Sequence, residues 1–452
     1  DLGTSTITGT LGVTAGGNIT DSGDLSVTGG TTLNANGNDI TLDNANDFST
    51  VAANGANVTL NDSNGIILGA STITGTLGVN ANGAITDNGN LTVTGGTTLN
   101  ANGNDITLDD ANNFSTVVAN GANVTLNDNN GIILGASTIT GTLGVTAGGN
   151  ITDSGNLSVT GGTTLNANGN DITLDNANDF STVAANGANV TLNDSNGIIL
   201  GASTITGTLG VTANGAITDS GNLSVTGGTT LNANGNDITL DNANNFSTVA
   251  ANGKDVTLND SNGIILGASR ITGTLGVTAN GAITDSGNLN VTGGTTLNAN
   301  GNDITLDDAN NFSTVAANGK DVTLNDSNGI NLGASTITGT LGVTATDVNI
   351  NGTVSAANAT FKPTSATSTI GIGDSAAGTF NLNTTDLSNL QSNGTVTIGS
   401  STVTGNVSIN TIDLSSETFN LAVQGGNPTF TGNLNLPKNL NVTATTGNIS
   451  QN

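Results

Sequence analysis

The stretch LSVTGGTTLNANGNDITL (residues 25–42) contains the pattern from which the fold can be predicted. Apolar residues alternate with Thr, Ser or Asn over a few positions, and each short run ends at Gly or Asn. Alternation with a period of two is typical of strands with one buried face, and Gly and Asn favour tight turns. The stretch therefore predicts short β-strands joined by sharp corners.

The same wording recurs in five blocks of 66 residues, and the first and third blocks differ only at Asp24 and Asn156. A sixth copy begins at Ser335 and is no longer recognisable after Thr344. Such regularity is typical of repeat architectures, in which each unit packs on its neighbours. We divide the chain into residues 1–4, the end of a preceding repeat, five repeats over 5–70, 71–136, 137–202, 203–268 and 269–334, and a divergent continuation over 335–452.

Glycine-rich breaks cut the first block into three segments of similar length, 10–30, 31–53 and 54–75. Each segment carries three β-prone patches, which is the composition of one turn of a parallel β-helix. We therefore predict an all-β parallel β-helix, or β-solenoid, with three coils per block. About 20 coils of roughly 22 residues, one strand spacing apart, would extend for about 100 Å.

Two recurring features predict which side chains face inward. The phenylalanine of each block (Phe48, Phe114, Phe180, Phe246 and Phe312) should fill the core of its own coil. Ile265 of the fourth block becomes Asn331 in the fifth, and an Asn is tolerated there only if the position faces outward or lies at an edge. The tail from Thr344 keeps the alternation, so the β-helix should continue through it. Pro363, Pro428 and Pro437 should mark loops, edges or distorted coils, and residues 361–373 a bulge or loop.

The charge of the chain excludes several classes of partner. Five Lys and Arg residues stand against 33 Asp and Glu, which gives a formal net charge of -28. A chain so poor in cations has no basic patch for phosphates, so we expect no nucleic-acid partner. No apolar run approaches the roughly 20 residues that span a bilayer, so we expect no membrane insertion of this segment.

The side chains offer little for catalysis, since His and Cys are absent and identical blocks carry no singular constellation. We expect no catalytic residues and no cofactor. Calcium is the remaining ligand question, because NANGNDITLD (residues 34–43) loosely resembles the nonapeptide of calcium-binding β-rolls. Asp39, Asp43, Asp47 and Asp62 are the candidate oxygen ligands. The alternative is that these residues occupy turns because their side chains cap backbone groups.

The wording of the repeats also carries a resemblance to a known class. LSVTGGTTLNANGNDITLDNANDF (25–48), NVTLNDSNGIILGASTITGTLGV (57–79) and the tail phrase FNLNTTDLSNLQSNGTVTIGSSTVTGNVSI (380–409) resemble the repeat arrays of filamentous-haemagglutinin-like giant adhesins. That class is exported by two-partner or autotransporter routes. The resemblance covers essentially the whole chain and implies a right-handed parallel β-helix shaft at the outer surface of a Gram-negative-type bacterium.

Three functional hypotheses follow from these observations. The first is a non-enzymatic extracellular shaft of a surface adhesin, whose receptor on cells, matrix or surfaces the sequence leaves open. The second is a self-assembling filament or sheath subunit, joined end to end by β-strand pairing. The third is a polysaccharide-active enzyme, which the missing basic and nucleophilic residues disfavour.

Overall fold

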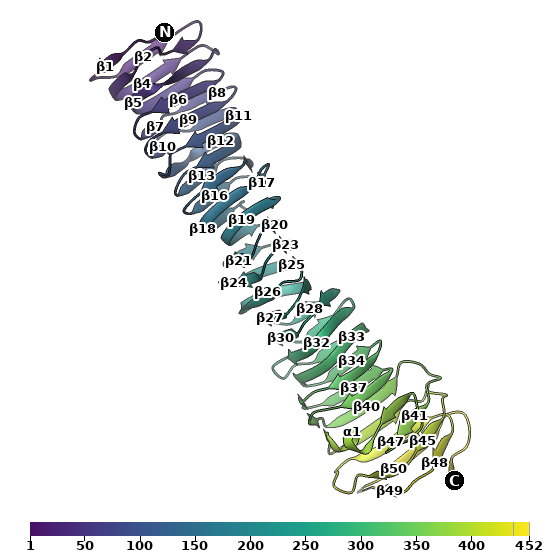
Figure 1. Ribbon diagram of the computed structural model, residues 1–452. Coiled ribbons are helices and arrows are strands. Elements are labelled where there is room, and N and C mark those ends of the chain that lie inside the picture. Colours follow the sequence, from purple (N-terminus) through teal and green to yellow (C-terminus); the bar gives the residue numbers. More distant parts are fainter. Residues whose placement is uncertain (437, 452) are drawn as a thin grey trace. The chain divides into compact units, whose positions relative to one another are not determined.

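The computed structural model describes residues 1–436 and 438–451, and it shows a parallel β-solenoid of about 22 turns. The prediction of an all-β solenoid is therefore confirmed. Internal contacts divide the chain into two units, Asp1–Gly227 and Gly228–Asn452. Within each unit, strands lie side by side in parallel, each paired with strands one turn before and one turn after it (Figure 1).

The strands of the first unit are β1 (Ser5–Ile7), β2 (Leu11–Thr14), β3 (Ile19–Thr20), β4 (Leu25–Asn34), β5 (Ile40–Asn54), β6 (Val58–Asp62), β7 (Ile66–Leu68), β8 (Ser71–Ile73), β9 (Leu77–Ala81), β10 (Ile85–Asp87), β11 (Leu91–Asn100), β12 (Ile106–Asn120), β13 (Val124–Asp128), β14 (Ile132–Leu134), β15 (Ser137–Ile139), β16 (Leu143–Ala147), β17 (Ile151–Asp153), β18 (Leu157–Asn166), β19 (Ile172–Gly187), β20 (Val190–Asp194), β21 (Ile198–Leu200), β22 (Ser203–Ile205), β23 (Leu209–Ala213) and β24 (Ile217–Asp219). Strand β25 (Leu223–Asn232) contains the boundary between the units.

The repeat-like part of the second unit contains β26 (Ile238–Gly253), β27 (Val256–Asp260), β28 (Ile264–Leu266), β29 (Ser269–Ile271), β30 (Leu275–Ala279), β31 (Ile283–Asp285), β32 (Leu289–Asn298), β33 (Ile304–Gly319), β34 (Val322–Asp326), β35 (Gly329–Leu332), β36 (Ser335–Ile337) and β37 (Thr340–Ala345). Its divergent part contains β38 (Asp347–Ile350), β39 (Val354–Ser355), β40 (Asn358–Pro363), β41 (Ile370–Ile372), β42 (Phe380–Leu382), helix α1 (Thr384–Ser388), β43 (Leu390–Gln391), β44 (Thr395–Gly399), β45 (Val407–Ile409), β46 (Ile412–Asp413), β47 (Asn420–Gly425), β48 (Pro428–Phe430), β49 (Leu434–Asn435), β50 (Leu440–Ala444) and β51 (Ser450–Gln451).

The prediction of three turns per block needs correction. One column of paired strands leads from β7 to β21, and β21 is the equivalent of β7 two blocks later. Successive partners in this column are Ile66, Ile85, Ile106, Val124, Leu143, Thr163, Val183 and Leu200. Two blocks therefore make seven turns, and one block makes three and a half. Equivalent positions of successive blocks consequently lie on different faces of the solenoid.

The correction arises because several corners contain no glycine. Strand β12 is 15 residues long and bends within its own length, where its pairing with β13 shifts register between Leu108 and Asn112. Strand β11 bends in the same way, between Val93 and Gly96. Cutting the sequence only at its glycine-rich breaks therefore merges neighbouring faces and makes each turn appear longer than it is.

Glycine is required at two recurring corners. Asn102 and Gly103 have φ angles of 48° and 82°, in the left-handed region that Asn and Gly tolerate best. At Gly95, an added Cβ would lie 2.6 Å from the carbonyl oxygen of Gly75 in the preceding turn. This contact keeps the two turns at strand spacing.

The interior consists of alternate side chains of every strand, as predicted. Phe48, Phe114, Phe180, Phe246 and Phe312 are all buried, which confirms their core role. Ile265 is 37% exposed, and the Asn331 amide donates to the carbonyl oxygen of Ser313 at 2.9 Å, so this position does face outward. Outward-facing amides also form ladders between turns, as when Asn100 donates to Asn80 and Asn80 to Asn61.

The tail continues the parallel stack, with two features that the sequence reasoning did not predict. Helix α1 begins with a capping box in which Asn383 and Asp386 bond each other's backbone N–H groups. A separate five-stranded sheet has the order β42-β41-β45-β48-β51.

The predicted proline positions agree with strand limits where they are described. Pro363 ends β40, and Pro428 begins β48. Pro437 lies outside the described residues. The expected irregular segment 361–373 is partly strand, since β40 extends to Pro363 and β41 covers Ile370–Ile372, with bends and turns only between them.

One core position of each block carries a hydroxyl group that hydrogen-bonds to nothing among the described residues, namely that of Thr31, Thr97, Thr163, Thr229 and Thr295. An unsatisfied buried polar group costs about 1–3 kcal/mol. We expect Thr97→Val to raise the free energy of unfolding by about 1 kcal/mol. Chemical denaturation would measure this, with the exposed neighbour Thr98→Val as the matched control. A loss of stability in Thr97→Val alone would contradict the assignment.

Candidate functional site

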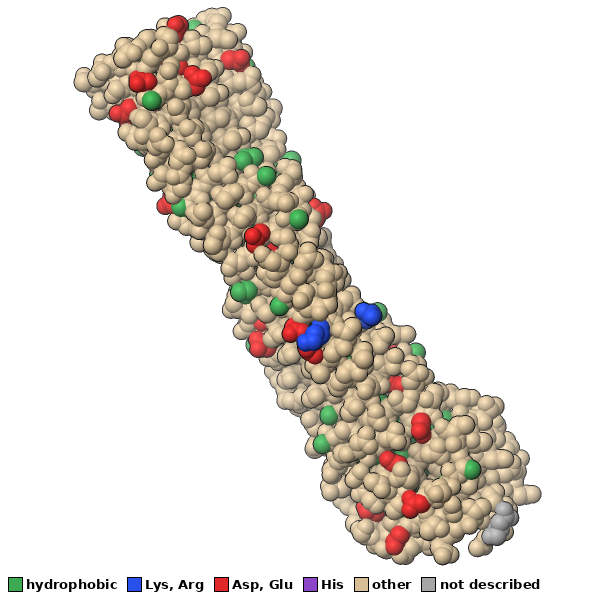
Figure 2. Space-filling view, viewed as in Figure 1, with side chains coloured by type: hydrophobic (Ala, Val, Ile, Leu, Met, Phe, Trp, Pro, Cys, Tyr) green, Lys and Arg blue, Asp and Glu red, His purple; other side chains and the backbone are tan. Residues whose placement is uncertain are grey.

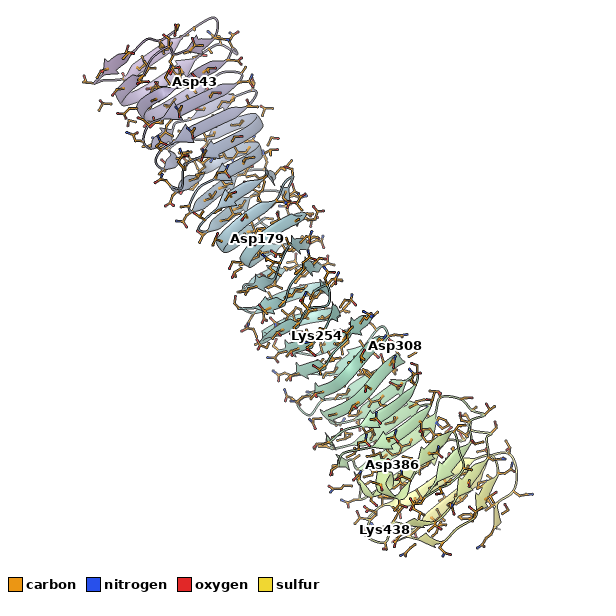
Figure 3. The ribbon with its side chains drawn as sticks, in the orientation of Figure 1. Asp43, Asp179, Lys254, Asp308, Asp386 and Lys438 are labelled. Carbon is orange, nitrogen blue, oxygen red and sulfur yellow. The ribbon has the colours of Figure 1, made fainter. Side chains whose placement is uncertain are left out.

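The four calcium candidates are engaged in separate hydrogen bonds. Asp39 accepts from the backbone N–H and side-chain amide of Asn57, at 3.1 and 3.0 Å. Asp43 is exposed, and it lies in the first turns of the first unit in Figure 3. Only Asp47 and Asp62 come together, since both accept from Asn64. Within residues 1–436 and 438–451, no three acidic, His or Cys side chains are grouped to hold a metal.

The strongest recurring polar feature is a buried carboxylate at one corner of each block. In the second block, Asp128 is 2% exposed and accepts from the backbone N–H of Phe114 at 2.6 Å and of Asn130 at 2.7 Å. The bend in β12 removes the Phe114 amide from the regular ladder, and the carboxylate satisfies it instead. Burial raises the pKa of Asp128 above its usual value of 3.8, although both hydrogen bonds oppose the shift. The equivalent residues are Asp62, Asp194, Asp260 and Asp326, each with a raised pKa.

A fully buried asparagine completes the same corner. Asn112 is 0% exposed, its Oδ1 accepts from the backbone N–H of Leu91 at 2.7 Å, and its Nδ2 donates to Asp87 at 2.7 Å. Asp87 also accepts from the backbone N–H of Asp109 at 3.1 Å. The three side chains Asp87, Asn112 and Asp128 therefore replace the ladder bonds that the bend interrupts.

Sequence reasoning missed this corner, although comparison of the blocks contained a signal. The position of Asn112 is Asn in all five blocks, and that of Asp128 is Asp in all five. At the neighbouring position of Asn113, by contrast, Asn and Asp interchange between blocks, as Asp47 shows. A position that refuses this exchange needs either an amide or a carboxylate for a specific contact.

A shallow surface hollow lies beside this corner in the first and third blocks. In the first block its volume is about 490 Å³, and in the third about 360 Å³. The first hollow is lined mainly by hydroxyl, amide and carboxylate groups over an apolar base, from Ser26, Thr28, Asp47, Ser49, Asn64 and Ile67. These groups can form hydrogen bonds, and the lining contains no nucleophile paired with a base. Acidic side chains are dispersed over the face in view in Figure 2.

The fourth and fifth blocks contain a paired exchange at an exposed corner. Where the first block has Ala56 and Asn57, the fourth has Lys254 and Asp255. Asp255 keeps the acceptor role of Asn57, because it accepts from both the N–H and the hydroxyl of Thr274 at 2.8 Å. It can no longer donate to Asp237, and Lys254 instead contacts both carboxylates, at 3.0 and 3.7 Å (Figure 3). The lysine therefore offsets the like charges that the exchange creates.

The raised pKa of the buried corner carboxyls predicts a pH dependence of stability. A carboxyl with a higher pKa in the folded state takes up protons on folding, so the free energy of unfolding should increase as pH falls from 7 toward 3.8. Below 3.8 this gain ends, and groups with a lowered pKa, such as Asp255 at about 2, lose their contribution. Denaturant unfolding between pH 7 and 4 would measure the trend.

High salt provides the control for this pH experiment. Repulsion between exposed carboxylates is screened by salt, whereas the desolvation of a buried group persists. The stabilisation on mild acidification should therefore remain at high ionic strength. A profile that is flat or falls from pH 7 to 5 would contradict the role assigned to burial.

The paired exchange predicts a coupled response of Lys254 and Asp255. The pKa of Asp255 is lowered to about 2 by the hydrogen bond from the backbone of Thr274 and then by Lys254. Lys254→Ala should raise this pKa part of the way toward 3.8, as measured by NMR titration. The double variant Lys254→Ala, Asp255→Asn recreates the first-block pair and should recover the stability lost in the single variant. An unchanged pKa in Lys254→Ala would show that the ion pair is not formed.

Comparison with known proteins agrees with the repeat organisation. A family model described as repeats of unknown function (DUF5649) matches residues 1–54, 55–120, 121–186, 187–252, 253–318 and 319–373. The four inner matches have the same period as the blocks. No curated protein and no solved structure gave a significant match. No helix in the described residues is long and apolar enough to cross a membrane. Because the matches extend over most of its length, the chain belongs to the DUF5649 family of repeats of unknown function.

Proposed function

We propose that this chain is a non-enzymatic shaft segment of a bacterial surface adhesin, which acts outside the cell in attachment to other cells or surfaces. The parallel solenoid supports a structural role, because stacked turns add length without needing a new core for each added block. The resemblance of the repeats to filamentous-haemagglutinin-like adhesins supports the extracellular location and the bacterial surface. The receptor is a feature of the other cell, matrix or surface.

One observation carries the proposal: the residues that stay constant between blocks make contacts between turns. Asp128 bonds the backbone of the preceding turn, and Gly95 contacts Gly75 across one strand spacing. Phe114 is buried in the same stack. Repetition has therefore preserved the joints of the solenoid, which is what a length-building element requires.

The competing filament hypothesis concerns the ends of the solenoid. An unpaired strand edge can accept a strand of a second copy, which would join chains into fibres. Electron microscopy of the purified chain at several concentrations separates the two hypotheses. Single particles of constant length support the shaft, and fibres that lengthen with concentration support the filament.

Deletion of one whole block tests the shaft directly. Removal of residues 71–136 joins Ala70 to Ser137, which recreates the natural junction between blocks. The variant should fold, and its longest dimension in small-angle scattering should fall by about 17 Å, because three and a half turns are lost at one strand spacing per turn. Bacteria that display either chain should attach to cells or surfaces better than bacteria that display none.

The control deletion removes half a block, residues 71–103, and should unfold or aggregate because strands on opposite sides of the junction no longer match. Equal stability of both deletions would contradict the stacking argument. Absence of attachment by the intact displayed chain would contradict the adhesive role. Turnover of acidic glycans by the purified chain would instead favour the enzyme hypothesis.

A further inference from the structure

The tail of the second unit contains one turn that is far longer than those of the second block. Val354 of β39 pairs with Leu390 of β43, whereas Ile106 already meets its partner at Val124. The additional chain within the long turn includes β41, β42 and helix α1. Asp386 fixes the helix to the stack by accepting from the backbone N–H of Ile350 at 2.9 Å. The turn that follows brings a loop back onto the same edge.

A groove of about 890 Å³ lies along this edge and extends over four successive levels of the stack. Thr336 pairs with Ser355, and Ser355 with Gln391, so these three residues are neighbours on adjacent strands. The fourth level is the loop with Glu417, which Thr418 fixes by donating its hydroxyl to the carbonyl oxygen of Ser392 at 2.6 Å. At one strand spacing per level, the four levels span about 14 Å.

The groove presents hydrogen-bonding groups that the protein itself does not use. Within the described residues, the hydroxyls of Thr336 and Ser355 and the side-chain amide of Gln391 form no hydrogen bond, and all three contribute to the groove. Glu417, the only glutamate of the chain, is half-buried and accepts from the Ser416 hydroxyl at 3.1 Å. Ala356 adds a small apolar area. Four spaced polar groups over a small apolar base can orient a hydroxyl-rich ligand.

The charge of the groove limits the ligand further. No Lys or Arg lines it, and Glu417 adds a negative charge, so phosphate, sulfate and uronate groups would be repelled. The lining has too little apolar surface for hydrophobic peptide side chains. We propose that this groove binds a neutral oligosaccharide, with Thr336, Ser355, Gln391 and Glu417 hydrogen-bonding successive parts of the chain of sugars. This proposal goes beyond the shaft role and does not depend on it.

The experiment uses the purified full chain and isothermal titration calorimetry. The probes are neutral oligosaccharides of glucose, mannose and N-acetylglucosamine, with oligouronates of equal length as acidic counterparts. We expect at least one neutral probe to bind and the oligouronates not to bind. Gln391→Ala and Thr336→Ala should each weaken binding by about tenfold, because each removes one hydrogen-bonding group in the groove. Glu417→Gln should weaken the neutral ligand by a smaller factor, since an amide oxygen still accepts.

Thr138→Ala is the matched control. Thr138 occupies the same block position as Thr336, and both backbone N–H groups bond an Asn side chain of the previous turn, but Thr138 does not line the groove. This variant should bind like the parent chain, and circular dichroism should show all variants folded. The proposal is overturned if no neutral probe binds, if acidic glycans or peptides bind in preference, or if Gln391→Ala and Thr336→Ala bind as tightly as Thr138→Ala. None of these outcomes would alter the attachment or length measurements that test the shaft.

Discussion

Every strand of this protein depends on a partner one turn away. Strands such as β7 and β8 contain only three residues, too few to be stable without neighbours on both sides. Their backbone N–H and C=O groups are satisfied by the turns before and after, and their apolar side chains meet only when turns are stacked. Each bend in the chain interrupts this pairing, and the side chains that repair it are therefore as important as the core.

The repair at the main corner explains why a carboxylate is buried there. Two backbone N–H groups, of Phe114 and Asn130, point at Asp128, and its two oxygens accept one bond each. An amide has only one acceptor oxygen and would set a donor against a donor. The cost of burying a charge appears as a raised pKa, and the two hydrogen bonds reduce that cost without removing it. Acidity in this chain is thus partly a requirement of its corners.

The fold was predictable because its signal is repeated, whereas the details depend on contacts that are invisible in a period. Alternation around Leu25–Asn34 indicated strands, and the change from Ile265 to Asn331 indicated an outward face; the structure agrees with both. The length of a turn could not be read from glycine positions, because the bend within β12 is stabilised by Asn112 and Asp87 instead. The candidate sites were less predictable still. The structure brings only Asp47 and Asp62 of the calcium candidates together, and calcium binding remains a prediction. The tail groove joins residues such as Ser355 and Gln391, which are distant in a segment without repetition, so no periodic pattern could align them.

The half turn by which a block exceeds three turns gives the array a phase as well as a length. Near-identical blocks are easily gained or lost by recombination between their coding sequences, and each junction between blocks would be preserved. Within a continuous stack, however, each such event would advance the following residues onto a different face, and only a change of two blocks would restore the original one. A change in block number would therefore alter both how far a surface feature lies along the stack and the direction in which it faces, so variants that differ by one block would present the same residues to different neighbours.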